Sequence, residues 1–578
     1  MIDTLSRKVA EISDHAAYRR VRRQAERGTL RDPEREARAR KVREHKEAQA
    51  TERKRRKEER LRADWHRHEP PWRRAPRVGD HGFEGRGGGK MGVIDRIPEF
   101  RATTPQLCGL NPWMVSGGVP MVGTPLGRRL DDDDQDVLFD PISWVYRTSL
   151  MNTPSLFLLG LPSLGKSTIG RKLAAGAIAQ GQIPLILADL KPDYANLVEE
   201  MGGQVIKLGR GEGYFNPLAV GALGSIIPLL EAFPKEQRRI RAQVRARQFR
   251  LVQGLCELVR RGPLVEDENN VLSKVIRLLE ADERFGPQNP PLLADLYTVI
   301  EQGPDELRMI VHARSDDAYE AKTDRLLGTL TSLLDGPLGE VFSQQTTTPI
   351  DLSSDNPPVA VCVDVSGIET GDTALEGAVL LACWEDGFGA IEAAHTLADV
   401  GLRPQRHFVA ILDELWRVLG AGPGMVGRVD MMTRLTRTLG TALILITHTI
   451  KDLESLEADF DIKKAKGFIE RAGAVIVGGL PKQEMEKLSE IIPFTRPEIA
   501  MVTSWSTPGS FDSHSKKKLP PPGRGKFLLK VGTDNTPGIA FRTILTPTEI
   551  ACGYHDTNAR FTGTNKTTLP PGSGRHAA

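Results

Sequence analysis

The segment Gly160–Ser167 has the residue types and spacing of a phosphate-binding loop. Its letters, GLPSLGKS, satisfy the pattern G-x-x-x-x-G-K-[ST], in which glycines let successive backbone N–H groups point inward at a phosphate. The Lys166 ammonium would contact the β- and γ-phosphates, and the Ser167 hydroxyl would be a ligand of Mg²⁺. We therefore predict a site for ATP and Mg²⁺ formed by Gly160, Leu161, Pro162, Ser163, Leu164, Gly165, Lys166, Ser167 and Thr168.

Two adjacent carboxylates follow a second apolar run, Val409–Leu412. The carboxyl ends of parallel strands converge on one crevice, so Asp413 and Glu414 would lie beside the phosphate loop. We expect Asp413 to hold Mg²⁺ and Glu414 to orient or deprotonate the attacking water. The alternative is an acid pair that merely caps a helix or lies on the surface, and the phosphate loop in the same chain favours the catalytic interpretation.

The next apolar run, Thr441–Ile446, ends in Thr447 and His448. A polar side chain at this strand end would lie close to the γ-phosphate, which makes His448 a candidate catalytic residue. The sequence by itself is equally compatible with a histidine whose ring is satisfied in the core or on the surface.

These residues depend on short apolar strands that alternate with helices from about residue 140 onward. This alternation is typical of an α/β fold with a parallel-rich central sheet and helices on both faces. The stretch 221–344 interrupts the alternation, because it shows helical periodicity and no convincing strand. The predicted strands span 155–159, 184–188, 204–208, 359–363, 408–412, 441–446 and 474–477.

The chain therefore divides into six predicted regions. They are a basic helical extension (1–75), a linker and lead-in (76–139), a first core part (140–220), an all-helical insertion (221–344), a second core part (345–555) and a disordered tail (556–578). The tail is rich in Thr, Pro and Gly, a composition that does not bury enough apolar surface to fold.

Composition excludes several classes of protein. The 578 residues are 39% hydrophobic and 26% charged, and no apolar run approaches the ~20 residues of a membrane-spanning helix. The N-terminus has no apolar signal-peptide core. The five cysteines are dispersed, which argues against a disulfide framework or a zinc site. We expect neither an integral membrane protein nor a secreted one.

The net charge of +3 conceals an asymmetry. Residues 1–80 carry 25 Lys/Arg against 15 Asp/Glu, so the remainder is net negative by 7. The basic run Arg53–Lys57 could contact phosphate or an acidic membrane surface. A solvated charged helix explains the same residues without a partner.

Together the motifs resemble the FtsK/HerA-like motor ATPases, and in particular the cytoplasmic ATPases of conjugative type IV secretion systems. The resemblance covers about residues 120–550 and includes the two nucleotide motifs and the helical insertion. It implies a RecA-like P-loop ATPase core that works as a ring, usually a hexamer. The further segments that carry it are 123–128, 140–141, 189–194, 202–203, 215–218 and 412–416.

The resemblance also implies an arginine that reaches the γ-phosphate of the neighbouring subunit. The matching position is Arg437, with Arg434 one turn earlier as the alternative. Two features depart from the family. The usual Thr-Gln after the sensing strand is Thr447-His448 here, and the usual N-terminal domain that docks on the secretion channel is replaced by a short, arginine-rich region.

The leading functional prediction is a Mg²⁺-dependent ATP hydrolase that powers conjugative transfer of DNA or protein. Its partners would be copies of itself and channel components, and it would be cytoplasmic, with peripheral contact to the inner face of the membrane. A second reading is a soluble motor or coupling protein that grips DNA directly. A third is a nucleic-acid or membrane-surface binding module in which the basic extension is primary and nucleotide only gates it.

Overall fold

A computed structural model describes most of the chain from residue 119 onward. The described residues are 119–131, 135–368, 371–420, 424–435, 440–456, 458–512, 517–518, 520–532, 536–553 and 555, with 23, 49, 52–53, 55–57, 78–79 and 82–83 before them. Contacts divide the chain into two compact units, Met1–Val115 and Ser116–Ala578. Most of the predicted basic extension and the predicted tail therefore lie outside the described residues.

Little of the first unit is described. Arg55 and Arg56 each form an ion pair with Glu52 at 3.0 Å, one helical turn away. Two short antiparallel strands, β1 (Val78–Gly79) and β2 (Gly82–Phe83), pair with each other. They lie in the predicted linker.

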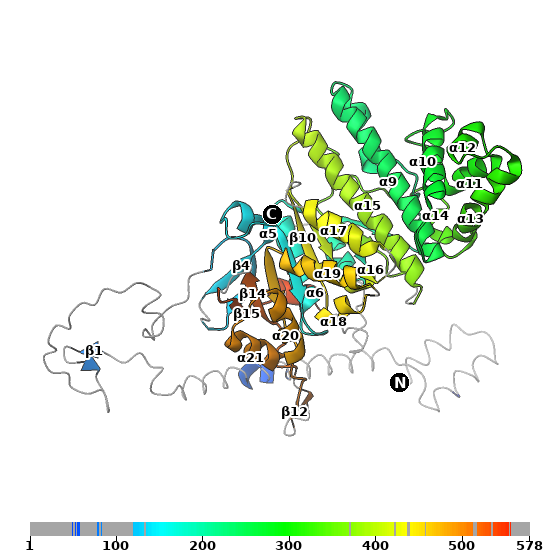
Figure 1. Cartoon of the computed structure of the whole chain (residues 1–578). Coiled ribbons are helices and arrows are strands. Elements are labelled where there is room, and N and C mark those ends of the chain that lie inside the picture. The colour runs from blue at the N-terminus through cyan, green and yellow to red at the C-terminus, as the bar shows by residue number, and fades with distance from the viewer. Residues whose placement is uncertain are drawn as a thin grey trace, which may run out of the picture. The chain divides into compact units, whose positions relative to one another are not determined.

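The second unit is built on a central sheet, for which the described residues supply eleven strands (Figure 1). Their order is β4-β3-β15-β14-β11-β5-β10-β9-β6-β8-β7. The seven strands from β11 to β7 run parallel, which confirms the predicted parallel-rich α/β fold. They are β5 (Ser155–Leu159), β6 (Ile183–Asp189), β7 (Gln204–Lys207), β8 (Val361–Asp364), β9 (Phe408–Leu412), β10 (Thr441–Ile446) and β11 (Ala474–Val477).

Four antiparallel strands extend the sheet beyond β11, and the sequence analysis did not predict them. They are β3 (Thr124–Arg129), β4 (Asp136–Phe139), β14 (Lys526–Val531) and β15 (Ile539–Thr543). Strands β3 and β4 fall in the stretch interpreted as a lead-in to the core. Their polar and charged residues hide them, because antiparallel strands near a sheet edge bury only part of their surface. A separate hairpin pairs β12 (Phe511–Asp512) with β13 (Lys517–Lys518).

Helices cover both faces of the sheet because the parallel strands are apolar on both sides. In β5, Leu156 and Leu158 pack into one apolar cluster and Phe157 and Leu159 into the other. Each such side chain contributes about 1.5–3 kcal/mol when fully buried. Helices α5 (Pro141–Tyr146), α6 (Lys166–Ala179) and α7 (Ala195–Glu200) line the first cluster. The long helix α15 (Thr373–Asp399) lines the second.

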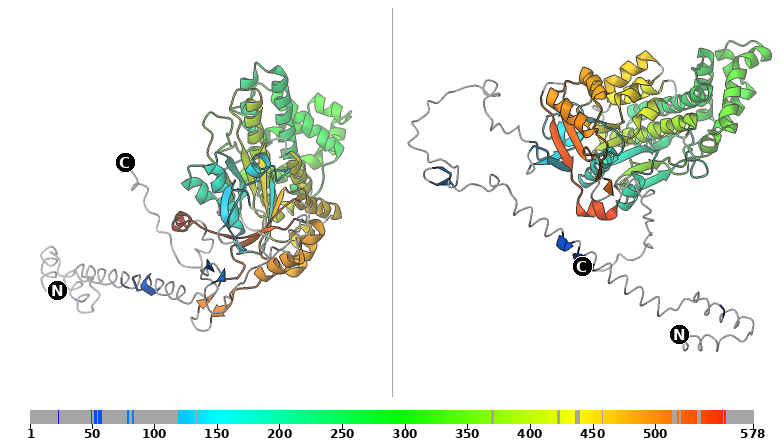
Figure 2. Two further views of the ribbon diagram at one scale, coloured as in Figure 1. Left: turned by 90° about the vertical axis from the view of Figure 1, so that its left-hand side faces the viewer. Right: turned by 90° about the horizontal axis from the view of Figure 1, so that it is seen from below.

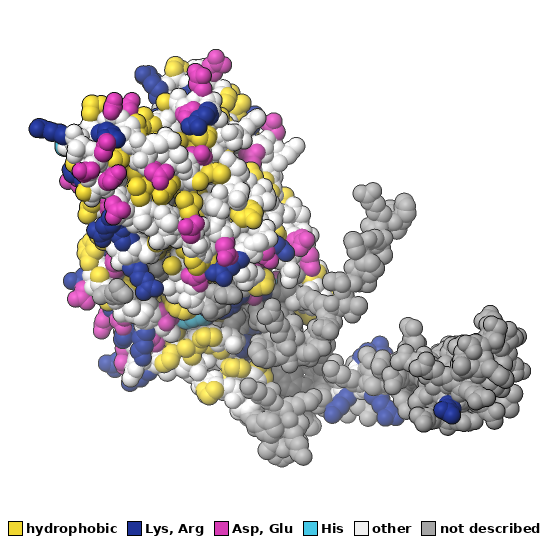
Figure 3. Space-filling view, turned by 90° about the vertical axis from the view of Figure 1, so that its right-hand side faces the viewer, with side chains coloured by type: hydrophobic (Ala, Val, Ile, Leu, Met, Phe, Trp, Pro, Cys, Tyr) yellow, Lys and Arg dark blue, Asp and Glu magenta, His cyan; other side chains and the backbone are white. Residues whose placement is uncertain are grey.

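The remaining helices of the core follow the strands in chain order. They are α16 (Leu415–Leu419), α17 (Met425–Leu435), α18 (Ile450–Glu454), α19 (Asp459–Glu470), α20 (Lys482–Ile491), α21 (Arg496–Trp505) and α22 (Pro547–Cys552). On the face seen in Figure 3, basic and acidic side chains are interspersed with apolar ones. In the described part of the chain, no helix combines the length and apolarity that crossing a bilayer requires.

The stretch 221–344 consists of helices and their connections (Figures 1 and 2). Its longest helix, α9 (Pro234–Arg260), runs beside α15. Ion pairs join the two helices, from Arg247 to Glu392 at 2.9 Å and from Arg250 to Glu385 at 3.2 Å. The helices are α8 (Gly221–Ser225), η2 (Pro228–Leu230), α9 (Pro234–Arg260), α10 (Glu266–Ala281), α11 (Leu293–Gln302), α12 (Asp305–Ile310), α13 (Asp316–Asp335) and α14 (Gly339–Phe342).

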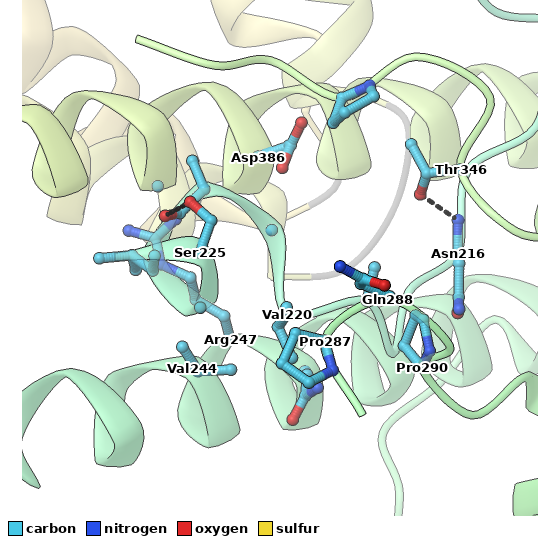
Figure 4. Close-up of a pocket in the computed structure, with 18 of the residues that line it drawn as sticks. Asn216, Val220, Ser225, Val244, Arg247, Pro287, Gln288, Pro290, Thr346 and Asp386 are labelled. Carbon is cyan, nitrogen blue, oxygen red and sulfur yellow. Dashed lines mark hydrogen bonds between the residues drawn. The ribbon is translucent and has the colours of Figure 1, made fainter. Parts of the chain in front are cut away.

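A cavity of about 940 Å³ lies where these helices meet the core (Figure 4). Arg247 of α9 and Asp386 of α15 line it, and burial raises the pKa of Asp386 to about 6. Asn216 and Thr346 also line it, and the backbone N–H of Asn216 donates to the Thr346 hydroxyl at 3.0 Å. None of the predicted nucleotide-site residues lines this cavity.

Candidate functional site

The predicted phosphate loop connects β5 to α6 at the carboxyl end of the sheet. Gly160 and Gly165 have φ angles of +156° and +108°, and Ser163 also has a positive φ of 63°. A Cβ at position 160 would lie 3.2 Å from Gly478 Cα, so glycine permits the close approach of the loop that follows β11. The sequence therefore forms a tight turn that feeds directly into a helix.

The first turn of α6 is open to an anion. Its N-cap is Gly165, which offers no side chain to the helix N–H groups, and the uncapped end of a helix carries a partial positive charge. Ser167 and Thr168, both half-buried, follow in the same turn. Burial raises the pKa of the nearby Asp193 carboxyl, while the positive charges of Arg171 and Lys191 and the Ser167 hydroxyl oppose this shift.

Lys166 folds back over the loop and is buried. Its Nζ donates to Gly160 O at 2.7 Å and to Leu161 O at 3.3 Å, and lies 2.7 Å from Nδ1 of His448. Burial lowers the pKa of Lys166 to about 8, although the negative charges of Asp413 and Glu414 act in the opposite direction. The ammonium is therefore desolvated and held by neutral acceptors, an arrangement that a phosphate oxygen would improve.

Asp413 lies directly after β9, with both carboxylate oxygens hydrogen-bonded. Oδ1 accepts from the Glu414 amide at 2.8 Å and Oδ2 from the Tyr194 hydroxyl at 3.0 Å. Burial raises the pKa of Asp413, and the charge of Glu414 raises it further, although these two hydrogen bonds and the charge of Lys166 oppose the shift. The described residues form no cluster of three or more His, Cys, Asp or Glu side chains able to hold a metal.

Glu414 is turned inward by its backbone, which adopts a left-handed conformation with φ of 53° at the start of α16. Its carboxylate accepts from Lys191 Nζ at 2.6 Å, Trp416 Nε1 at 2.8 Å and His448 Nε2 at 3.0 Å. Burial would raise the pKa of Glu414, but the hydrogen bonds from His448 and Lys191 and the positive charge of Lys191 outweigh it and hold the pKa well below its usual range. Glu414 is therefore ionised at neutral pH.

His448 joins the phosphate loop to the acidic strand end. Since the ammonium of Lys166 can only donate, Nδ1 must accept from it, and Nε2 carries the proton given to Glu414. The strand order explains this bridge: β10 lies between β5 and β9, with Leu443 beside both Ser155 and Ala410. The strand-end residues of three separate chain segments thus meet in one place.

The structure brings together the predicted phosphate loop, Asp413, Glu414 and His448. Arg437 lies outside the described residues, and the side chain of Arg434 is not described either. The sequence analysis gave no role to Lys191 or Tyr194, although both lie in segment 189–194, which it named as part of the family resemblance. The signal that could have found them is position, because this segment follows β6, the strand beside β9.

Comparisons with known proteins identify the fold. No family model and no curated protein matches the sequence. Among solved structures, VirB4 of Thermoanaerobacter pseudethanolicus aligns with a TM-score of 0.55 at 16% identity, over 75% of this chain and 100% of that chain.

The plasmid coupling protein TrwB also aligns, with lower scores. In complex with the ATP analogue ADPNP it gives a TM-score of 0.39 at 13% identity, over 75% of this chain and 96% of that chain. TrwB in complex with ADP and Mg²⁺ aligns with a TM-score of 0.37 at 12% identity, over 68% of this chain and 85% of that chain. The VirB4 alignment shows that this chain shares the fold of that protein, and it agrees with the parallel-rich α/β fold predicted from the sequence.

Proposed function

We propose that this protein is a Mg²⁺-dependent ATP hydrolase that acts as a ring motor for conjugative, type IV secretion transfer of DNA or protein. The observation that carries the proposal is the chain of contacts from Lys166 through His448 to Glu414. It links the cation of a phosphate-binding loop to an ionised carboxylate, and these are the two groups that bind and hydrolyse a nucleoside triphosphate.

The residues present fit a triphosphate with its metal. The open first turn of α6 and the inward-turned loop 160–165 would bind phosphate oxygens. Lys166 would exchange its backbone acceptors for a phosphate, and Ser167 with Asp413 would hold Mg²⁺, whose remaining ligands are commonly water and phosphate oxygens. When bound, the metal neutralises charge that develops on the phosphate oxygens.

Glu414 would orient the attacking water and accept its proton, since the carboxylate is ionised and buried. His448 would fix the positions of the Glu414 and Lys166 side chains through its contacts with both. As part of the same proposal, Arg437 of a neighbouring copy would complete the site. An arginine supplied in this way contributes about 10³–10⁵ in turnover.

The test compares nucleotide binding and ATP turnover in wild type and two variants. Lys166→Ala should abolish binding or turnover because it removes the phosphate cation, and Glu414→Gln should bind ATP but fail to hydrolyse it. The matched control is Lys482→Ala, since Lys482 on α20 is exposed and lies outside the site. Turnover that survives in Lys166→Ala or Glu414→Gln would overturn the proposal.

Assembly and cargo need their own measurements. We expect the mass in solution to rise with ATP and the turnover per subunit to rise with protein concentration, because the site would be completed in trans. Arg437→Ala should keep nucleotide binding and lose turnover. ATP turnover strongly stimulated by DNA would favour the alternative of a motor that grips DNA directly. The proposal places the protein at the inner face of the membrane as a peripheral component of the channel.

A further inference from the structure

Tyr194 is a fully buried side chain that reaches the candidate metal ligand. Tyr194 follows strand β6, and Asp413 follows the neighbouring strand β9. The Tyr194 hydroxyl is buried and donates to Oδ2 of Asp413 at 3.0 Å. Because the Glu414 amide already donates to Oδ1, the hydroxyl supplies the second fixed donor. Two donors on opposite oxygens determine how the carboxylate plane is oriented.

The segment that carries Tyr194 is anchored by Asp189, the buried last residue of β6. The Asp189 carboxylate accepts from the amides of Asp193 at 3.2 Å, Tyr194 at 2.7 Å and Ala195 at 3.1 Å. The preceding residue, Ala188, has a φ of +97°, and the register of β6 with β8 shifts between Ile186 and Asp189. A non-glycine residue keeps such a strained conformation only where its surroundings impose it, so the backbone is bent to hold this turn.

The phosphate-loop helix is shaped around the same hydroxyl. A Cβ at Gly170 of α6 would lie 2.3 Å from Tyr194 Oη and 3.1 Å from Ile446 Cδ1. Glycine is a poor helix former, yet it stands in the interior of α6, where only its missing side chain makes room. Arg171 ties the two segments together, donating to Ser167 O at 3.1 Å and to Asp193 O at 3.2 Å.

We infer that Tyr194 is a positioning residue that orients Asp413 toward Mg²⁺, and that Gly170 is required to admit its hydroxyl. This inference rests on the proposed function. The alternative is a purely structural role, in which the hydroxyl merely satisfies its own burial and Asp413 is oriented without it. Hydrogen-bond partners of metal ligands typically change metal affinity by about 10- to 100-fold when removed, and a structural role predicts no such change.

The decisive variant is Tyr194→Phe, which removes the hydroxyl and keeps the ring. We would titrate Mg²⁺ into the full-length protein with a fluorescent ATP analogue and record nucleotide binding, with a parallel series in EDTA. The Mg²⁺ concentration at half-maximal enhancement should rise by about 10- to 100-fold, while binding in EDTA stays unchanged. The matched control is Tyr319→Phe, because the Tyr319 hydroxyl is also buried but donates to Ile300 O at 2.8 Å, in the helical stretch.

A double-mutant cycle tests the role of Gly170. Gly170→Ala should weaken the response to Mg²⁺ as Tyr194→Phe does, because its methyl group would displace the hydroxyl. In the Tyr194→Phe background the same substitution should add much less, since the closest atom is gone. Thermal unfolding of each variant establishes that it is folded. If Gly170→Ala does not fold, the comparison of Tyr194→Phe with Tyr319→Phe decides alone.

The outcomes separate this inference from the proposed function. An unchanged Mg²⁺ response in Tyr194→Phe, with normal nucleotide binding by wild type, would overturn the positioning role and leave the ATPase proposal standing. An equal loss in Tyr319→Phe would also overturn it, because the effect would then be one of general stability. Absence of nucleotide binding by wild type would overturn the proposed function itself.

Discussion

Replacing His448 tests the contact that joins the two halves of the site. His448→Ala would remove the acceptor that lies 2.7 Å from Lys166 Nζ and the donor that lies 3.0 Å from Glu414 Oε2. His448→Gln is the matched comparison, because a glutamine amide also combines one acceptor with a donor.

The expected size of the effect follows from the partners that remain. Without the imidazole, Lys166 keeps two carbonyl acceptors, and Glu414 keeps Lys191 and Trp416. Of the two hydrogen bonds that are removed, the one to Glu414 acts on the chemical step, and a hydrogen bond to a charged group contributes about 1.5–3 kcal/mol. Since 1.36 kcal/mol corresponds to tenfold in rate, His448→Ala should lower turnover by about 10- to 100-fold.

The assay separates binding from chemistry. Equilibrium binding of ATP should change little in His448→Ala, because Lys166 and the loop remain, whereas single-turnover hydrolysis should slow by the stated factor. His448→Gln should keep most of the rate. If His448→Ala hydrolyses ATP at the wild-type rate, the functional link between Lys166 and Glu414 through His448 is refuted. If His448→Ala and His448→Gln lose the same factor in hydrolysis rate, the site requires more of the imidazole than one acceptor for Lys166 and one donor for Glu414.

Two further predictions concern charge at the site. Since burial lowers the pKa of Lys166 to about 8, the free protein loses its ammonium above pH 8, and ATP binding there must take up a proton. Affinity should fall by about tenfold per pH unit from pH 8 toward 10, and a flat profile of binding against pH would contradict this. Lys191→Ala should leave ATP binding intact but raise the pKa of Glu414, because the lysine helps to lower it. The acid limb of the pH–rate profile should then move to higher pH, and an unmoved limb would exclude this role.

The sequence determined the parts of the site whose signal is local. The phosphate loop is recognisable because its glycines, lysine and serine lie within eight consecutive residues between an apolar run and a helix. Asp413, Glu414 and His448 could be predicted because each follows a strand-sized apolar run, and parallel strands present their carboxyl ends on one edge. The strands β5, β9, β10 and β11 have the predicted bounds.

Only the tertiary structure decided which of these strand ends touch. The order β5-β10-β9-β6 places His448 between Lys166 and Glu414, and Tyr194 within hydrogen-bonding distance of Asp413. No local pattern encodes those pairs, since 219 residues separate Tyr194 from Asp413 along the chain. The four antiparallel strands were missed for a related reason. Their partly polar sequences become strands through pairing with distant segments, and such pairing depends on the whole sheet rather than on the sequence of one strand.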